Sequence, residues 1–231
     1  MANQLDLEEQ EQLDQLKHFW QQYGNLITWG LIIVLGSIGV WNGYQFWQRK
    51  QSVQSAAMFE ELEKLVRMGD VQKAERAFID MRERFSSAVY TQQAGLMLAK
   101  MSYETGKVDV AKAALAWVAE HSSDKGYASL AHLRLSGILV DTKAYDDALK
   151  LLNSGVTSEF SALAADRRGD IHVLQGNKPE AKLEYQKAFG LFDERTPYRR
   201  MVGIKLGALG VDPESLARSV AQSTSGAEGT K

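Results

Sequence analysis

The sequence predicts an all-α protein in which a single transmembrane helix precedes a superhelix of short helix-turn-helix repeats. Three observations lead to this fold class. Only three of the 231 residues are prolines, helix-favouring residues are abundant, and the alternation of apolar and polar residues that marks strands is scarce. One long stretch, residues 19–48, contains no Asp, Glu, Lys or Arg. After it, segments of one pattern recur every 33 to 37 residues.

The charge and composition exclude several classes of function. A net charge of −2 does not give the strongly basic surface typical of nucleic-acid binding, so no nucleic-acid partner is expected. The absence of cysteine rules out disulfides, thiolate metal sites and a cysteine nucleophile. It is equally compatible with an oxidising and a reducing compartment, so composition leaves the location open.

Residues 1–22 are predicted to form a short acidic segment, because five carboxylates precede the first lysine, Lys17. A removable secretory signal would instead begin with basic residues and end at a small-residue cleavage site. A buried core helix would rarely run as far without a charge as residues 19–48 do. The apolar stretch is therefore interpreted as an uncleaved anchor.

Residues 23–48 are predicted to form the transmembrane helix. The uncharged stretch would cover about 45 Å as a helix, at roughly 1.5 Å per residue, which is enough for a bilayer with its headgroups. Gly39 and Gly43 form a small-xxx-small pair that would let a second helix approach, although glycine is common in membrane helices in any case. Aromatic rings at both ends would lie at the membrane interfaces; these anchors are Trp20, Tyr23, Trp41, Tyr44 and Trp47.

The orientation of the predicted span is not fixed by the flanking charges. Lys17 precedes it, whereas Arg49, Lys50, Lys64 and Arg67 follow it. The positive-inside tendency would place the C-terminal domain in the cytoplasm, but large domains can translocate regardless of flanking charge. The charge count alone favours a cytoplasmic domain weakly.

Residues 49–210 are predicted to form the repeat domain. Four segments align: GDVQKAERAF from residue 69, GKVDVAKAAL from 106, KAYDDALKLL from 143 and GNKPEAKLEY from 176. Each has an alanine five residues after its start and a large apolar residue four further on, and a small residue usually stands twelve positions before the alanine. The expected packing residues are Ala74, Phe78, Ala111, Leu115, Ala148, Leu152, Gly169, Ala181 and Tyr185.

This spacing is typical of stacked helical pairs, because small residues let two helices approach while a large one fills the groove between neighbouring pairs. The pattern resembles the tetratricopeptide repeat in its A-x3-F half, whereas the W-x2-L-G-x2-Y half is largely missing. The repeats would be degenerate, and an irregular helical bundle is the alternative. The expected helix pairs are 51–68 with 70–85, 88–105 with 107–121, 126–141 with 144–153, and 159–175 with 178–192.

The C-terminal end of the chain is predicted to close the array and then lose order. A helix near 195–209 would cap the open end, and Pro213 would begin a short final turn. The small, polar residues 211–231 are expected to form a disordered tail.

No pattern of catalytic, cofactor-binding or metal-binding residues is found. None of the four histidines belongs to a close ligand pair, and no phosphate-binding glycine loop follows a strand. The densest charged group, DRRGD at residues 166–170, would either guide a partner or form a solvated helix face around a packing glycine, and we favour the second interpretation. The sequence thus predicts a protein that is not an enzyme and has no cofactor.

Three stretches carry a resemblance to a known family. They are LDQLKHFWQQYGNLITWG, GYQFWQRKQSVQSAAMFEEL and, most specific, AADRRGDIHVLQGNKPEAKLEYQKAF. Their order and spacing along residues 5–210 are similar to those of the YfgM family, the ancillary subunits of the bacterial SecYEG translocon with a tetratricopeptide-like domain.

The resemblance implies a single-pass protein of the bacterial inner membrane with its repeat domain in the periplasm. It implies association with the SecYEG channel and with a PpiD-like periplasmic chaperone, and a role in helping client polypeptides leave the channel. Two other hypotheses stay open on the residues alone. They are a cytoplasmic-facing, membrane-tethered repeat scaffold for another complex and a membrane-anchored enzyme.

Overall fold

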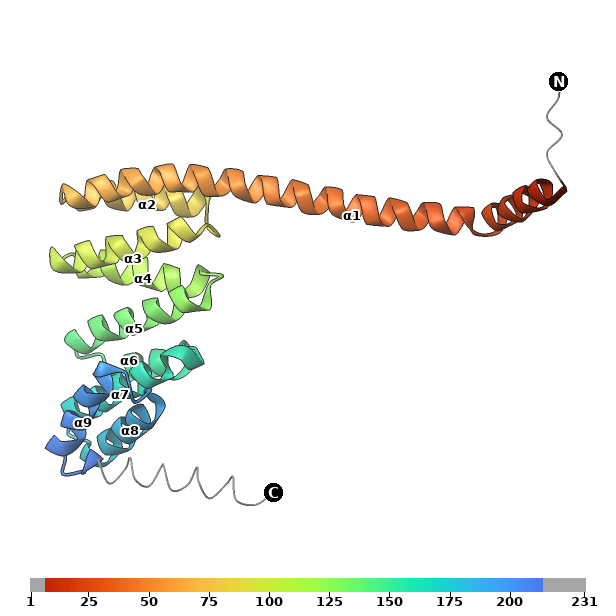
Figure 1. The fold of residues 1–231 in the computed structure, drawn as a ribbon. Helices are drawn as coiled ribbons and strands as arrows, with labels where there is room; N and C mark the ends of the chain where they lie inside the picture. The colour runs from red at the N-terminus through yellow and green to blue at the C-terminus, as the bar shows by residue number, and fades with distance from the viewer. Residues whose placement is uncertain (1–6, 214–231) are drawn as a thin grey trace, which may run out of the picture. The chain divides into compact units, whose positions relative to one another are not determined.

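In the computed structural model, which describes residues 7–213, every regular element is a helix (Figure 1). The chain divides into two compact units, residues 1–53 and residues 54–231. The prediction of an all-α chain is confirmed, while the tail expected at 211–231 lies outside the described residues from 214 onward. The helices are α1 (Leu7–Arg67), α2 (Val71–Arg84), α3 (Val89–Glu104), α4 (Val108–His121), α5 (Lys125–Asp141), α6 (Tyr145–Ser154), α7 (Ser161–Leu174), α8 (Lys178–Leu191) and α9 (Pro197–Ala208), with a short 3-10 turn, η1 (Ser158–Phe160), before α7.

The first unit consists of the N-terminal part of α1. Two of its hydroxyl side chains bond back to the helix: Thr28 Oγ1 donates to the Gly24 carbonyl and Ser37 Oγ donates to the Ile33 carbonyl, each at 2.7 Å. The large apolar side chains along it are exposed, among them Leu26, Leu31, Ile32, Ile33, Leu35, Ile38 and Val40.

The membrane crossing predicted from the sequence stays a prediction. Among the described residues, no single helix combines the length and apolar character that a bilayer crossing requires. The two arms Lys17–Leu26 and Thr28–Arg67, which meet at a bend of 41°, have that length and apolar character only when they are taken together. α1 is continuous across the expected boundaries at residues 22 and 48. These boundaries therefore also remain predictions.

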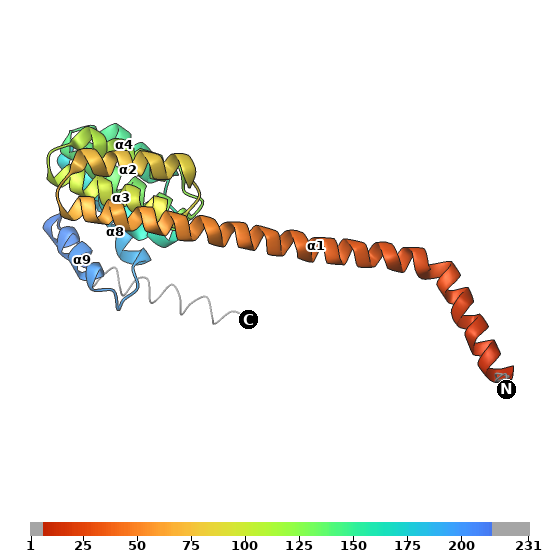
Figure 2. The ribbon, with the colours of Figure 1, turned by 90° about the horizontal axis from the view of Figure 1, so that it is seen from above.

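The second unit is a stack of antiparallel helices that follow one another in chain order (Figure 1). Figure 2, turned by 90°, looks along the stack, so that α2, α3 and α4 overlap. The helix pairs predicted from the repeats coincide closely with those observed; residues 88–105 and 107–121, for example, contain α3 and α4. The predicted cap at 195–209 contains α9.

One backbone turn recurs inside every pair and explains why three of the four repeat segments begin with glycine. Gly69, Gly106 and Gly176 have φ values of 74°, 75° and 80°, in the left-handed region that glycine adopts without steric cost. In the turn after α3, the Gly106 amide donates to the Tyr103 carbonyl at 3.0 Å, and the next amide donates to the Ser102 carbonyl at 2.7 Å. Such bonds satisfy the last carbonyls of a helix.

The third turn has the same hydrogen bonds but holds Lys143, with a φ of 61°. Its amide donates to the Val140 carbonyl at 2.9 Å, and the Ala144 amide donates to the Leu139 carbonyl at 2.8 Å. A side chain in this region costs of order 1 kcal/mol. The turn therefore forms because the helices on either side impose it.

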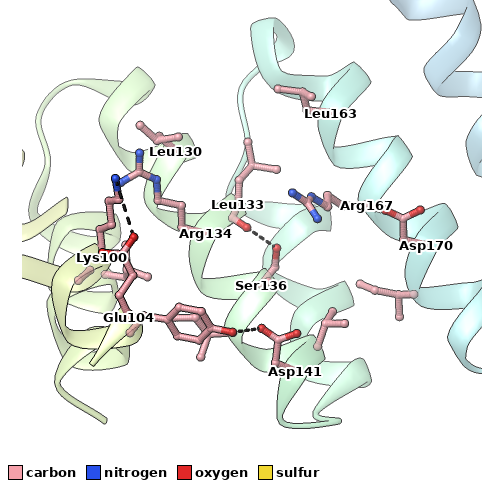
Figure 3. A pocket seen from close by; sticks show the side chains of 17 residues that line it. Lys100, Glu104, Leu130, Leu133, Arg134, Ser136, Asp141, Leu163, Arg167 and Asp170 are labelled. Carbon is pink, nitrogen blue, oxygen red and sulfur yellow. Dashed lines mark hydrogen bonds and ion pairs between the residues drawn. The ribbon is translucent and has the colours of Figure 1, made fainter. Parts of the chain in front are cut away.

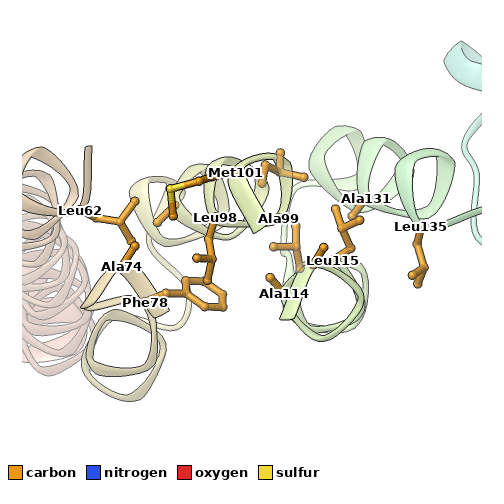
Figure 4. Packing of buried hydrophobic residues seen from close by; sticks show 14 of the residues in the cluster. Leu62, Ala74, Phe78, Leu98, Ala99, Met101, Ala114, Leu115, Ala131 and Leu135 are labelled. Atoms are coloured by element: carbon orange, nitrogen blue, oxygen red, sulfur yellow. The ribbon is translucent and has the colours of Figure 1, made fainter. Parts of the chain in front are cut away.

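The apolar core runs through the stack at the level of the small repeat residues. The four repeat alanines are fully buried: Ala74, Ala111, Ala148 and Ala181 each have 0% of their surface exposed. Phe78, Leu115, Leu152 and Tyr185 are also buried. Figure 4 shows the first part of this core, where Phe78 of α2 and Leu98 of α3 point toward each other and Ala99, Ala114 and Leu115 lie together farther along.

Candidate functional site

A groove on the repeat unit is the strongest candidate for a functional site. It is a cavity of about 690 Å³ formed mainly by α3, α5 and α7 (Figure 3), and Leu115 of α4 also lines it. Its apolar lining includes Leu130, Leu133 and Leu163 together with Ile138, Val140 and Ile171. A concave, mostly apolar surface with a few polar groups is the usual character of a binding site.

A second hollow of about 490 Å³ extends the groove toward the start of the repeat unit. It is lined by residues of α3, α5 and the end of α1, including Val66, Met97 and Met101. The two hollows share Lys100, Glu104 and Arg134, so they lie next to each other along the repeats. The methionines of the second hollow supply flexible, polarisable contacts that tolerate varied ligands.

Charged side chains of both signs line the groove, and its three carboxylates each have a neighbouring donor or cation. Lys100 Nζ lies 3.9 Å from Glu104 Oε1. The hydroxyl of Tyr103 donates a short hydrogen bond to Asp141, and this bond raises the pKa of that tyrosine. Asp170 accepts hydrogen bonds from Lys205 Nζ and from the Tyr185 hydroxyl, each at 2.7 Å.

The basic side chains of the rim are less committed. Arg134 makes only a long contact, 3.4 Å from its Nη1 to the Leu96 carbonyl oxygen, and the exposed Arg167 has no ion pair within the described part of the chain. The groove therefore presents two guanidinium groups without a carboxylate partner beside an apolar floor.

A buried polar network supports the end of the groove formed by α7. Asp166 has no exposed surface; its two carboxylate oxygens accept from Lys205 Nζ at 2.7 Å and from the Tyr198 hydroxyl at 2.8 Å. Lys205 also bonds Asp170, so one lysine of α9 joins two carboxylates of α7. On the neighbouring side, Arg168 pairs with Glu184 at 2.8 Å and donates to the Leu152 carbonyl at 3.0 Å.

This network corrects the interpretation of residues 166–170 as a solvated helix face. Asp166 is fully buried and Arg168 is 8% exposed, because α8 and α9 cover the side of α7 on which they lie. Arg167 is exposed to solvent, and both it and the partly buried Asp170 line the groove. Nothing in the repeat pattern identifies Lys205, 39 residues away from Asp166, as its partner.

The network predicts a loss of stability at alkaline pH. Burial and the hydrogen bond to Asp170 raise the pKa of Tyr185, and burial and the bond to Asp166 raise that of Tyr198. For Lys205, burial opposes the charged form, but the bonds to both carboxylates outweigh it and the pKa is raised. Groups with raised folded-state pKa values stabilise below their unfolded values, about 10, and this contribution falls as pH rises further.

We therefore expect the repeat unit, through α7–α9, to unfold at a lower denaturant concentration at pH 11 than at pH 8, as followed by circular dichroism. The variant Lys205→Met should be less stable than the wild type at pH 8. Between pH 8 and pH 11 it should lose less stability than the wild type does, because one of the three titrating groups is gone. An equal loss in both proteins would contradict a role for Lys205 in the pH dependence.

The residues predicted from the sequence lie mostly outside the groove. Of the nine packing residues, Leu115 alone appears in its lining. The predicted aromatic anchors are all exposed on α1: Trp20, Tyr23, Trp41, Tyr44 and Trp47. A Cβ added at Gly39 or Gly43 would meet no atom within 4 Å. Their roles at a membrane are not tested by these positions and stay predictions.

The groove residues carried a signal that repeat alignment can reveal. Arg134 and Arg167 are 33 residues apart, and Glu104 and Asp141 are 37 apart, the same intervals as the repeat alanines. Equivalent positions on successive first helices of the pairs thus line one face. No group of three or more metal-ligating side chains occurs among the described residues.

The comparisons with known proteins agree with the repeat architecture. The family model described as a tetratricopeptide repeat-like domain matches residues 17–211. An ancillary SecYEG translocon subunit of Haemophilus influenzae is 31% identical over 186 residues, which cover 79% of this chain and 89% of that protein. The proteins of the same description from Neisseria gonorrhoeae and Escherichia coli are 28% and 25% identical, and the matches cover 88% of this chain and 98% and 97% of theirs.

Proposed function

Because the chain belongs to the YfgM family of ancillary SecYEG translocon subunits, with a tetratricopeptide repeat-like domain, we propose that it is a membrane-anchored accessory subunit of the Sec translocon. It binds the SecYEG channel and passes secreted or membrane clients to a PpiD-like periplasmic chaperone. The observation that carries this proposal is the length of the match. Relatives of this description align over almost their entire length, and the family model covers residues 17–211, so the match includes the proposed anchor as well as the repeat unit.

The first unit supports the anchoring part of the proposal. Its apolar side chains are exposed, and both Thr28 and Ser37 satisfy their hydroxyl groups on the helix itself, as a lipid environment requires. We assign residues 23–48 to the span, residues 49–210 to the repeat domain and residues 211–231 to a polar tail. The proposed location is the inner membrane, with the repeat domain in the periplasm.

The groove supports the adaptor part of the proposal. Superhelical repeats commonly bind partners along one extended face. Here that face is apolar at its floor, and its carboxylates are held by tyrosine or lysine side chains. We therefore propose a role in protein–protein contact and not in catalysis.

The test is site-specific photocrosslinking in inner-membrane vesicles that carry an arrested, exported nascent chain. A photoreactive residue in place of Leu133, in the groove, is expected to label the nascent chain or the chaperone, and SecY should copurify with the full-length protein. Leu183 of α8 is the matched control, because it is 66% exposed but absent from both hollows of the groove. Equal labelling from both positions, or no copurifying SecY, would contradict the proposal.

A cytoplasmic-facing scaffold is the second candidate, and the four basic residues that follow the span favour it. Protease added to intact spheroplasts distinguishes a periplasmic repeat domain from a cytoplasmic one. If the repeat domain is periplasmic, the added protease should remove a C-terminal tag placed beyond Gly210. Protection in spheroplasts, followed by cleavage after detergent lysis, would place the domain in the cytoplasm.

A further inference from the structure

Gly137 lies in the middle of α5 without any structural need for glycine. A Cβ built at this position meets no atom within 4 Å, and the φ angle is an ordinary helical one. By contrast, a Cβ at Gly95 would come within 2.5 Å of Val118. Glycine is among the least favourable residues in a helix interior. What glycine does provide at position 137 is empty space in the groove, whose lining it joins.

The positions equivalent to Gly137 in the neighbouring repeats carry long or charged side chains. Lys100 stands 37 residues earlier on α3, and Asp170 stands 33 residues later on α7. The floor of the groove is therefore lowest between them. Leu133, one helical turn before Gly137 on α5, lines the cavity next to this position, whereas Leu130 and Leu163 line it nearer the starts of α5 and α7 (Figure 3).

The shape and character of this space fit a large apolar side chain. The cavity of about 690 Å³ falls within the range of clefts that enclose bound ligands, roughly 300–1,000 Å³. Side chains of the lining leave the middle of the groove open instead of closing it by packing. An aromatic ring or leucine side chain that entered at Gly137 would contact apolar atoms on three helices.

Two guanidinium groups of the lining offer contacts to acidic neighbours of that side chain. Arg134 and Arg167, on α5 and α7, occupy equivalent repeat positions and have no carboxylate partner among the described residues, whereas Glu104, Asp141 and Asp170 are engaged. Guanidinium groups bind carboxylates through paired hydrogen bonds in a defined geometry. Electrostatic complementarity of this kind selects between partners.

We propose that the groove binds an extended polypeptide segment in which a large apolar side chain enters the space at Gly137 and the Asp or Glu residues on either side of it contact Arg134 and Arg167. The inference rests on the proposed function and specifies its ligand class: acidic–apolar segments of unfolded chains. We name the space above Gly137, next to Leu133 in the lining of the groove, the Gly137 socket.

The test measures peptide binding to the full-length protein in lipid nanodiscs by fluorescence anisotropy, with empty nanodiscs as a blank. The probe is a labelled twelve-residue peptide with two Asp-Phe-Asp units in a Gly-Ser background. Its comparison peptides replace Phe by Ala or Asp by Lys. We expect the wild-type protein to bind the probe at least tenfold more tightly than either comparison peptide.

The variant Gly137→Leu is expected to weaken binding of the probe at least tenfold, because its side chain fills the socket. It should not lower the thermal stability, since the added Cβ meets nothing and leucine favours the helix. Gly190→Leu is the matched control: Gly190 also lies in a helix with no atom within 4 Å of its Cβ, but it is absent from the groove. Equal effects of the two substitutions on peptide binding would contradict the proposal that the apolar side chain binds in the Gly137 socket.

The double variant Arg134→Glu/Arg167→Glu tests the acidic neighbour. It is expected to prefer the peptide with Lys in place of Asp, whereas an unchanged preference would overturn this part of the inference. Failure of the wild-type protein to distinguish the three peptides would overturn the inference as a whole. The proposed function would still be decided separately, by SecY copurification and by crosslinking from position 133.

Discussion

Replacement of Gly169 by alanine is expected to destabilise the C-terminal end of the repeat unit by about 2–3 kcal/mol, because the new methyl group overpacks a rigid site. The added Cβ would lie 2.5 Å from both Cδ1 and Cε1 of Tyr185, well inside contact distance. The ring has little freedom to retreat, since it is 3% exposed and its hydroxyl is bonded to Asp170. The helix-propensity gain from glycine to alanine, about 1 kcal/mol, offsets only part of the strain.

The measurement is hydrogen exchange of α7–α9 in the full-length protein, which reports local unfolding of this end. Gly137→Ala is the matched control, because it makes the same change inside a helix where the Cβ meets nothing. It should be neutral or stabilise by up to about 1 kcal/mol. The double variant Gly169→Ala/Tyr185→Leu should recover part of the loss. Similar protection in Gly169→Ala and Gly137→Ala would contradict the packing role of Gly169.

Removal of the Lys205 charge is expected to have the largest effect, about 3–5 kcal/mol in the variant Lys205→Met, because it leaves a buried carboxylate without its cation. Asp166 would keep only the hydrogen bond from Tyr198, and Asp170 would keep only that from Tyr185. Methionine retains most of the length of the side chain, so the loss reports the charge more than the packing. Faster hydrogen exchange of α7–α9 at neutral pH would show it.

The exposed pair Lys150–Asp147 provides the control, because its side chains are 78% and 65% exposed. Lys150→Met should change stability by less than about 0.5 kcal/mol. Substitution of both partners, in Asp166→Asn/Lys205→Met, should cost less than Lys205→Met alone, since no charge then remains buried at position 166. A Lys205→Met protein as stable as the Lys150→Met protein would contradict the importance of the network.

The fold was largely predictable because its signals are local. A glycine with positive φ begins three of the four repeat segments, and the buried alanines follow at fixed distances from it. Lys143 could be aligned with the three glycines although it is not a glycine, because Ala148 and Leu152 follow it at the same distances as in the other repeats. Each helix pair is determined by residues close in the sequence, which is why alignment of four short segments located them.

The site was less predictable because its residues belong to different repeats. Arg134 and Arg167 act together only when α5 and α7 are stacked, and Asp166 finds its cation 39 residues farther along. A charged run such as residues 166–170 looks solvated until a later helix covers it. Gly137 could have been noticed as a helix-interior glycine, but its use as open space depends on neighbours from both adjacent repeats.

The separation of Asp166 and Lys205 also sets an order of events during synthesis. At about 5–20 residues per second, the 39 residues between them take about two to eight seconds to make. During this interval Asp166 has no lysine to neutralise it, and hydration of its carboxylate opposes the burial of α7. The cores of the earlier repeats contain no residue of α9, so these repeats can fold before Lys205 is made. The last repeat therefore closes late, and a chain cut short before residue 205 ends in an open repeat.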